Sequence, residues 1–338
     1  MNIMDTPVTW QDIETAYTVV SEIVQETPCW HASKLSEIYG SNIYLKREDR
    51  QKVRSYKIRG AYNKMRSLSQ DALQNGVVCA SAGNHAQGVA YSCHKLGVRG
   101  VIFMPVTTPQ QKIDSVKYFG KDSIEIKLFG TTFDDSSAAA KAFASENAMA
   151  FIPPFDDPVI IAGQGTASYE ILRHMDSIGV ALDYVFVPIG GGGLASGTST
   201  YFKAKSPQTK VIGVEPAGAA SMKTAIQAGH PVTLEQMDTF VDGAAVGRAG
   251  DITYSICREL LDDIITIPEG AVCTAMLEMY NRSGIVLEPA GALTVAALRF
   301  CQDMIRGKNV CCILSGSNND VYRMSEIQRR SKEYEESL

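Results

Sequence analysis

From about residue 77 onward the chain alternates short β-rich runs with amphipathic segments, and this alternation constrains its fold more than any other feature. Repeated strand-helix-strand units are typical of α/β proteins with parallel sheets. The runs predict strands at 77–80, 101–104, 124–128, 150–152, 184–187, 211–215 and 310–314.

Helical segments are expected between these strands. Ala86, Val89, Ala90 and Cys93 recur at three- and four-residue spacings, which gives one apolar face of a helix. A further helix is expected to follow Thr108, with Pro109 at its first position. The remaining expected helices cover roughly 57–68, 133–147, 165–174, 251–262, 268–281 and 290–305, and the charged tail 329–338 is predicted to be a solvated helical end.

The proline pair at 153–154, followed by Asp156-Asp157-Pro158, closes the first block of units. We therefore expect two doubly wound, open parallel-sheet domains. The small domain would comprise residues 77–155, and the large one residues 1–76 together with 156–338.

Composition narrows the function to small-molecule chemistry. The 338 residues are 45% hydrophobic and 20% charged, with a net charge of −5 and no cluster of basic residues. A chain with this charge distribution lacks the basic surface that binds nucleic acid or an anionic membrane. The N-terminus lacks the basic and apolar regions of a signal peptide, which favours the cytoplasm. The eight cysteines show no metal-ligand spacing and are expected to be buried and reduced, so no metal is predicted.

Four consecutive glycines, Gly190-Gly191-Gly192-Gly193, follow a predicted strand and precede a helix. Their N–H groups and the helix N-terminus can bind a phosphate. The run also satisfies the dinucleotide pattern G-x-G-x-x-A through Ala195, and Glu215 ends the next strand, so a nicotinamide enzyme remains an alternative. No P-loop sequence is present.

Two other polar turns follow predicted strands. Ser81-Ala82-Gly83-Asn84-His85 suits a carboxylate or small anion, and the alternative is a plain helix cap made by Ser81 or Asn84. His85 is interpreted as a hydrogen-bonded residue rather than a general base. Ser315 follows the last strand, at the edge of a parallel sheet where ligands bind.

Lys57 lies in the run Ser55-Tyr56-Lys57-Ile58-Arg59-Gly60-Ala61. A lysine is a nucleophile only when part of its population is deprotonated, which requires desolvation or a neighbouring cation. Taken alone, the run fits a solvated surface lysine at the start of a helix better than a nucleophile, since most lysines are exposed.

The motifs gain weight in combination. The Lys57 run, the segment 81–85, the tetraglycine with Leu194, Glu288-Pro289-Ala290-Gly291-Ala292 and Ser315-Gly316-Ser317-Asn318 occur here in order. This pattern resembles the catalytic part of the threonine dehydratases (threonine ammonia-lyases), which share the tryptophan-synthase β-like fold type II of pyridoxal-phosphate enzymes with the serine racemases. The resemblance extends from Thr27 to Arg323.

The resemblance implies a role for each motif. Lys57 would carry pyridoxal 5'-phosphate covalently and, once freed by substrate, remove the α-proton before the β-hydroxyl leaves. The implied cofactor contacts are Gly190, Gly191, Gly192, Gly193 and Leu194 to the phosphate, Asn84 to the ring hydroxyl, Ser315 to the ring nitrogen, and Tyr56 and Gly243 beside the ring. Ser81, Ala82, Gly83, Asn84 and His85 would receive the substrate carboxylate.

The expected reaction is conversion of L-threonine to 2-oxobutanoate and ammonia, with side activity on L-serine. Racemases similar to this chain carry serine at the position of Ala82, and a carboxylate of their cation site falls on Ser221, so racemisation and a cation near Glu215 are disfavoured. Sulfide-dependent β-replacement, as in cysteine synthases, and non-catalytic cofactor binding remain alternatives. The resemblance also implies a homodimer or homotetramer, in isoleucine biosynthesis or threonine catabolism. Because this chain stops near Glu336, no regulatory domain and no isoleucine feedback are expected.

Overall fold

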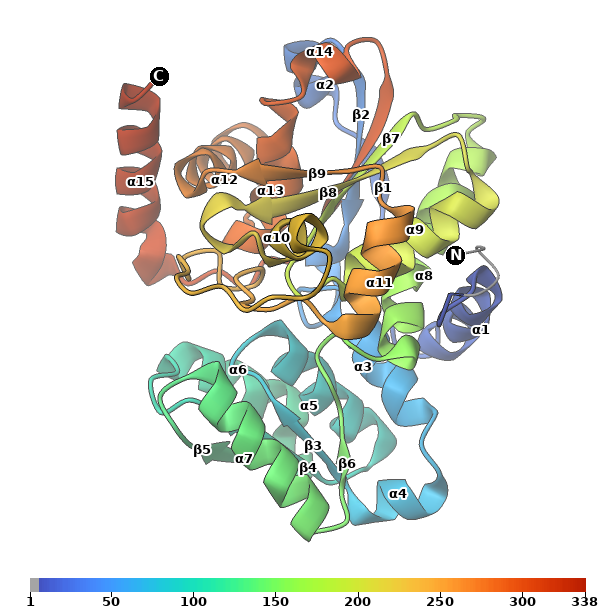
Figure 1. Cartoon of the computed structure of the whole chain (residues 1–338), viewed down its shortest axis with the longest axis vertical. Helices are drawn as coiled ribbons and strands as arrows, with labels where there is room; N and C mark the ends of the chain where they lie inside the picture. The colour runs from blue at the N-terminus through green and yellow to red at the C-terminus, as the bar shows by residue number, and fades with distance from the viewer. Residues whose placement is uncertain (1–5) are drawn as a thin grey trace.

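The computed structural model describes residues 6–338 and contains two sheets flanked by helices (Figure 1). The larger sheet has six strands in the order β1-β2-β10-β7-β8-β9, and the smaller has four in the order β5-β4-β3-β6. The strands of the larger sheet are β1 (Cys29–His31), β2 (Asn42–Arg47), β7 (Tyr184–Pro188), β8 (Lys210–Pro216), β9 (Asp263–Ile267) and β10 (Asn309–Leu314). Those of the smaller sheet are β3 (Val77–Ala80), β4 (Gly100–Met104), β5 (Ile124–Leu128) and β6 (Ala150–Phe151).

The first seven helices divide between the two sheets: the first two lie beside the larger sheet, the third links the two units, and the other four pack on the smaller sheet (Figure 1). They are α1 (Trp10–Val20), α2 (Ser33–Tyr39), α3 (Lys57–Arg66), α4 (Gln70–Asn75), α5 (Asn84–Leu96), α6 (Gln110–Gly120) and α7 (Phe133–Glu146). The later helices surround the larger sheet. They are α8 (Pro158–Ser177), α9 (Gly193–Lys205), α10 (Ser221–Ala228), α11 (Asp251–Leu260), α12 (Glu269–Ser283), α13 (Pro289–Leu298), α14 (Gln302–Ile305) and α15 (Met324–Glu336).

The predicted α/β fold with parallel sheets is confirmed, and every strand expected from the alternation is present. One strand departs from the expected direction, because β1 pairs antiparallel with β2 at the sheet edge. Strands β1, β2 and β9 were not predicted. The smaller sheet lies wholly between residues 77 and 151. That the two units are separate domains, divided as proposed at 76 and 156, stays a prediction.

Some helix bounds were wrong. Helix α8 begins at Pro158 rather than 165, because the Asp157 carboxylate accepts hydrogen bonds from the N–H groups of Val159 (2.9 Å) and Ile160 (3.1 Å). The segment expected as one helix over 290–305 is divided into α13 and α14. The terminal helix begins at Met324 and packs on α12, so it is only partly solvated.

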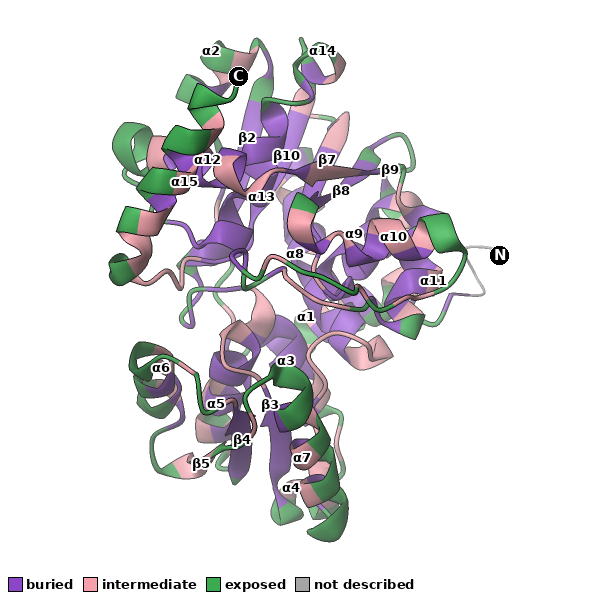
Figure 2. Cartoon of the chain, turned by 60° about the vertical axis from the view of Figure 1, so that its left-hand side comes forward, coloured by how far each residue is buried: buried purple, intermediate pink, exposed green. Residues whose placement is uncertain are grey.

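The parallel register places several functional turns at one edge of the larger sheet. β10 lies between β2 and β7, with Cys311 opposite Tyr44 on one side and Val185 on the other. Ser315 follows β10 and the glycine run follows β7, so both lie at the same edge of the larger sheet, where its parallel strands end. The central strands of both sheets are buried, while the edge strand β5 and the outer faces of α7 and α15 are partly or fully exposed (Figure 2). Within residues 6–338 no helix is long and apolar enough to cross a membrane.

Candidate active site

Lys57 is the first residue of α3, and the chain enters the helix through Tyr56 without a side-chain cap. Its side chain is half-buried, and Nζ donates a hydrogen bond to the carbonyl of Pro154 at 2.9 Å. Burial lowers the pKa of Lys57 to about 8, against the opposing effect of the Glu288 charge. A minor fraction of the amine, about a tenth at pH 7, is therefore unprotonated, far more than for an ordinary lysine, as a nucleophile or base requires.

The segment that accepts the Lys57 hydrogen bond also covers the glycine run. A Cβ atom on Gly191 would lie 2.3 Å from the ring of Phe155, so only glycine fits beneath this ring. Gly192 has a φ of +94°, in the left-handed region that favours glycine. Helix α9 then begins at Gly193 without a side-chain cap, which leaves the N–H groups of its first turn available to an anion.

The turn at 81–84 is half-buried and leads into α5. Gly83 is the N-cap residue, and no side chain caps this helix. Ser81 Oγ instead accepts a hydrogen bond from the N–H of Gly83 at 3.2 Å. The plain helix cap, by Ser81 or by Asn84, is therefore wrong, and no side chain among the described residues caps the N–H groups of the first turn of α5.

His85 is buried, and its Nε2 lies 2.9 Å from the carbonyl of Ile152. Burial lowers the pKa of His85 to about 3, and the nearby Lys57 charge acts in the same direction. The ring is neutral at physiological pH and carries one N–H group. Because a carbonyl oxygen can only accept, Nε2 carries this hydrogen and donates the hydrogen bond. The structure agrees with the interpretation of His85 as a hydrogen-bonded residue.

Glu288 was quoted in a motif but given no function, and the structure places it among the predicted site residues. Its carboxylate accepts hydrogen bonds from Asn84 Nδ2 (2.6 Å) and from the N–H of Asn318 (3.1 Å). Burial raises the pKa of Glu288 to about 7, with a smaller contribution from the Asp242 charge. The sequence signal was a carboxylate followed by the apolar run Pro289–Leu298, all of it buried.

The remaining predicted residues approach this centre through the backbone. The N–H of Tyr56 donates to the carbonyl of Ser315 at 3.2 Å, and Ser315 is 2% exposed. A Cβ atom on Gly243 would lie 2.8 Å from Ala290 and 3.9 Å from Asn84 Nδ2. The motifs of Lys57, Asn84, the glycines, Glu288 and Ser315 are thus brought together, although they span most of the chain. Leu194 lies in the first turn of α9 and packs into the core.

These residues fit pyridoxal phosphate. The desolvated Lys57 amine suits a carbonyl, and the uncapped start of α9 suits a phosphate. Residues 20–316 match the family model of the pyridoxal-phosphate dependent enzymes. The chain belongs to this family.

Several proteins of named activity are similar to this chain over nearly its whole length. The biosynthetic L-threonine dehydratase IlvA of Halalkalibacterium halodurans is 54% identical over 325 residues, which cover 96% of this chain and 78% of the relative. The processed threonine deaminase isoform 2 of Solanum lycopersicum has a TM-score of 0.90 and 41% identity, with 95% of this chain and 93% of that one covered. The serine racemase of Dictyostelium discoideum has a TM-score of 0.85 and 32% identity, over 94% and 100% of the two chains.

In this pyridoxal-phosphate enzyme Glu215 is not available for the ribose contact of the nicotinamide alternative. It is buried, and its carboxylate accepts hydrogen bonds from the N–H groups of Met222 (2.8 Å) and Lys223 (2.9 Å) at the start of α10. Burial raises the pKa of Glu215 to about 7. Among residues 6–338 no group of three or more His, Cys, Asp or Glu side chains could hold a metal ion. All eight cysteines are buried and unpaired, as predicted.

Proposed function

We propose that this enzyme is a threonine ammonia-lyase that converts L-threonine to 2-oxobutanoate and ammonia. The observation that carries the proposal is the half-buried Lys57 amine, with a pKa of about 8, held beside the glycine-rich start of α9 by the Pro154–Phe155 segment. The similarity to threonine dehydratases over 96% of the chain supports the same activity. The relative from Halalkalibacterium halodurans is a biosynthetic threonine dehydratase, which favours a place for this enzyme in isoleucine biosynthesis.

The proposal gives each group of residues one task. Lys57 would hold the cofactor and take the α-proton from the substrate, and the start of α9 with Leu194 would hold the phosphate. The cofactor, when bound, supplies an electron sink for the pair released at the α-carbon. Asn84 and Ser315 would orient the ring, with Tyr56 and Gly243 beside it. The N–H groups of residues 81–85 would hold the substrate carboxylate.

Two features favour elimination over other reactions of the family. Ser315 presents a hydroxyl rather than a carboxylate at the end of β10, which would leave less positive charge on the ring and favour prompt loss of the β-substituent. Ala82 has no proton to transfer, so racemisation would lack its second acid or base. Serine differs from threonine by one methyl group, worth about 1–3 kcal/mol of discrimination, so we also expect turnover of serine.

A steady-state assay tests the proposal. Release of 2-oxo acid and ammonia is measured with threonine, serine and O-acetylserine as substrates. The highest kcat/KM is expected for threonine, with slower turnover of serine. Sulfide-dependent replacement on O-acetylserine, or colour without turnover, would support the alternative functions instead. The absence of bound pyridoxal phosphate, together with binding of a nicotinamide cofactor, would overturn the proposal.

Replacing Lys57 tests its assignment. In Lys57→Ala the α-proton has no base, so we expect kcat to fall by about 100-fold or more. The melting temperature of the cofactor-free protein should be close to that of the parent, since the residue contributes no core packing. Borohydride reduction of the parent should attach the cofactor to Lys57, as detected by peptide mass spectrometry. Residual turnover within about tenfold of the parent would show that another group is the base.

We further propose that the enzyme acts in the cytoplasm as a homodimer or homotetramer, with an amino acid as its small-molecule partner and neither nucleic acid nor membrane. The net charge of −5 and the scattered basic residues support the last two points. Size-exclusion chromatography with light scattering measures the oligomeric state, and a monomer at micromolar concentration would contradict it.

A further inference from the structure

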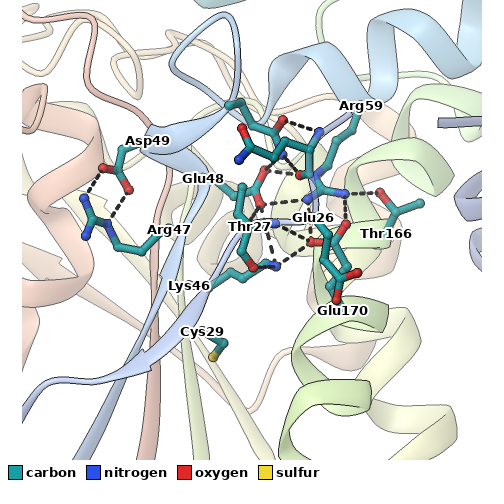
Figure 3. Close-up of polar contacts among 12 residues, drawn as sticks. Glu26, Thr27, Cys29, Lys46, Arg47, Glu48, Asp49, Arg59, Thr166 and Glu170 are labelled. Carbon is teal, nitrogen blue, oxygen red and sulfur yellow. Dashed lines mark hydrogen bonds and ion pairs between the residues drawn. The ribbon is translucent and has the colours of Figure 1, made fainter. Parts of the chain in front are cut away.

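Four charged side chains lie together in the interior between the larger sheet and α3 and α8 (Figure 3). They are Lys46 on β2, Glu48 immediately after it, Arg59 on α3 and Glu170 on α8. Each is at most 2% exposed. Two cations and two anions make the group electrically neutral, but none of the four has a function in the proposed reaction.

Arg59 is the centre of this group. Its Nε and Nη2 donate to Glu48 at 2.8 Å each, and its Nη1 and Nη2 donate to Glu170, also at 2.8 Å. Nη1 makes a further hydrogen bond to Thr166 Oγ1 at 3.1 Å. All five N–H groups of the guanidinium therefore have a partner, and they point in fixed directions.

The carboxylates are held in turn by other polar groups. Thr27 Oγ1 donates to Glu48 Oε1 at 2.5 Å, and Lys46 Nζ donates to Glu170 Oε2 at 2.5 Å and to the carbonyl of Thr27 at 2.8 Å. Burial is the largest single effect on the pKa of Glu48 and would raise it. The charge and hydrogen bonds of Arg59, the charge of Lys46 and the hydrogen bond of Thr27 together outweigh burial, so the pKa is lowered. Each of the four side chains thus has a partner of opposite charge within the group.

The position of Arg59 connects this group to the site. Arg59 lies two residues after Lys57, in the first turn of α3, and its N–H donates to the carbonyl of Tyr56 at 2.9 Å. Glu48 belongs to the sheet side and Glu170 to α8, so the guanidinium joins the start of α3 to both. A shift or rotation of α3 would break several of these bonds at once.

Helix α8 also packs on the helix that begins at the glycine run. A Cβ atom on Gly163 would lie 2.7 Å from the Cα of Gly60 on α3, and one on Gly197 of α9 would lie 2.6 Å from the N of Gly165. Thus α8 makes close backbone contact with α3 on one side and with α9 on the other. Helix α8 therefore sets the distance between α3, which carries Lys57, and the start of α9, where the cofactor phosphate would bind.

Stability is a weak explanation for these charges, since a buried ion pair gains little over apolar residues of similar size. We propose that Arg59 is a positioning residue, whose bonds to Glu48 and Glu170 hold the first turn of α3 so that Lys57 keeps its place relative to the start of α9. The proposal rests on the assignment of Lys57 as the cofactor-binding lysine. It predicts that loss of the guanidinium impairs cofactor binding and proton removal even when the charge balance is kept.

Two variants separate positioning from charge balance. Arg59→Met with Glu170→Gln leaves one cation and one anion, so the group stays neutral without the guanidinium. Arg59→Lys keeps the charge but cannot reproduce five directed hydrogen bonds. Ile171→Val, which removes a methyl group from a fully buried side chain beside Glu170, is the matched control for a small loss of packing.

The measurements are the melting temperature of the cofactor-free protein, the dissociation constant for pyridoxal phosphate by absorbance titration, the fraction of Lys57 labelled on borohydride reduction, and kcat and KM for threonine. In both Arg59 variants we expect binding of pyridoxal phosphate to weaken by about tenfold or more, with less labelling. We expect kcat to fall by about a hundredfold, as for a misplacement of about 1 Å, while KM changes less. Ile171→Val should change none of these by more than about twofold.

The outcomes are distinct. If the neutral double variant or Arg59→Lys matches the parent in cofactor affinity and kcat, the positioning role is overturned. If both unfold, Arg59→Gln and Glu48→Gln in the cofactor-bound enzyme replace them, and parental labelling and kcat there would again overturn it. If the parent itself neither labels at Lys57 nor releases 2-oxobutanoate, the proposed function fails, irrespective of Arg59.

Discussion

At the scale of single residues, the site depends on burial changing the charge of ordinary side chains. Lys57 loses part of its protonation, while Glu288 retains a proton to about pH 7. The direction of each shift follows from desolvation, which disfavours the charged form in both cases. The site therefore has an amine and a carboxyl group whose proton affinities are brought close together.

The raised pKa of Glu288 predicts a pH dependence of stability. Its folded value of about 7 lies above its ordinary value of 4.5, so in this range the folded protein keeps a proton that the unfolded chain releases. The stabilisation is fully present below the ordinary value and is lost as pH rises through the folded one. Over the whole range the change is on the order of 3 kcal/mol.

The variant Glu288→Gln removes this titration. Urea unfolding of cofactor-free protein between pH 5 and pH 8.5 should show that the free energy of unfolding falls less with pH in the variant than in the parent. Glu146→Gln, at an exposed position near the end of α7, is the control and should follow the parent. Parallel curves for parent and Glu288→Gln would mean that the carboxyl group is ionised throughout this range.

At the scale of elements, glycines fix how closely neighbouring helices pack, because they allow two backbones to come into contact. At Gly197 an added Cβ would lie 2.6 Å from the N of Gly165 and 2.6 Å from the carbonyl of Ile161, both backbone atoms of α8 that cannot rotate away. The contact between α8 and α9 is thus incompatible with any larger residue unless one helix moves.

Gly197→Ala tests this contact. We expect a loss of about 1–3 kcal/mol in the free energy of unfolding, because overpacking outweighs the gain in helix propensity. Weaker binding of pyridoxal phosphate should accompany it, since the start of α9 moves. Gly247→Ala is the control, because a Cβ there meets nothing within 4 Å. Equal stability of the two variants would show that α9 can shift freely.

The elements themselves were largely predictable, for reasons visible in particular segments. The strands at 77–80 and 124–128 were expected with the bounds they have, because the first is a short apolar run and the second alternates apolar and charged residues. Strand β2 was missed because it ends in two charged residues, Lys46 and Arg47, and charged residues are rarely buried in a strand. Those charges are compatible with burial only because carboxylates neutralise them, Glu170 of α8 for Lys46 and the neighbouring Asp49 for Arg47.

At the scale of the molecule, an ion pair joins the small unit to a loop of the rest of the chain beside the site. Lys112 Nζ on α6 lies 2.5 Å from Asp242 Oδ2, next to Gly243. A depression of about 430 Å³ lies near this bridge, lined by residues of α6 together with Arg54 and Asn318. The bridge links the small unit to the loop that approaches Asn84.

Lys112→Met tests whether this bridge, by holding the loop at Asp242 against α6, contributes to substrate binding. Both side chains are partly exposed, so the free energy of unfolding should change by less than about 1 kcal/mol. We expect KM for threonine to rise by roughly threefold at low salt, and the difference from the parent to shrink at high salt as screening weakens the parental pair. Lys117→Met, on an exposed position of the same helix, should leave KM unchanged. An unchanged KM in Lys112→Met would contradict the prediction.

The sequence by itself determined the fold class, the family and the residues that meet at the site, because local periodicity and ordered motifs are written along the chain. It also indicated an anion site at the glycine run, since four glycines after a strand leave free N–H groups. Only the tertiary structure decided the state of Lys57, the place of Glu288 and the pairing of Arg59. These depend on desolvation and on partners more than 90 residues away in sequence, such as Pro154 for Lys57 and Glu170 for Arg59. No local pattern encodes such distances.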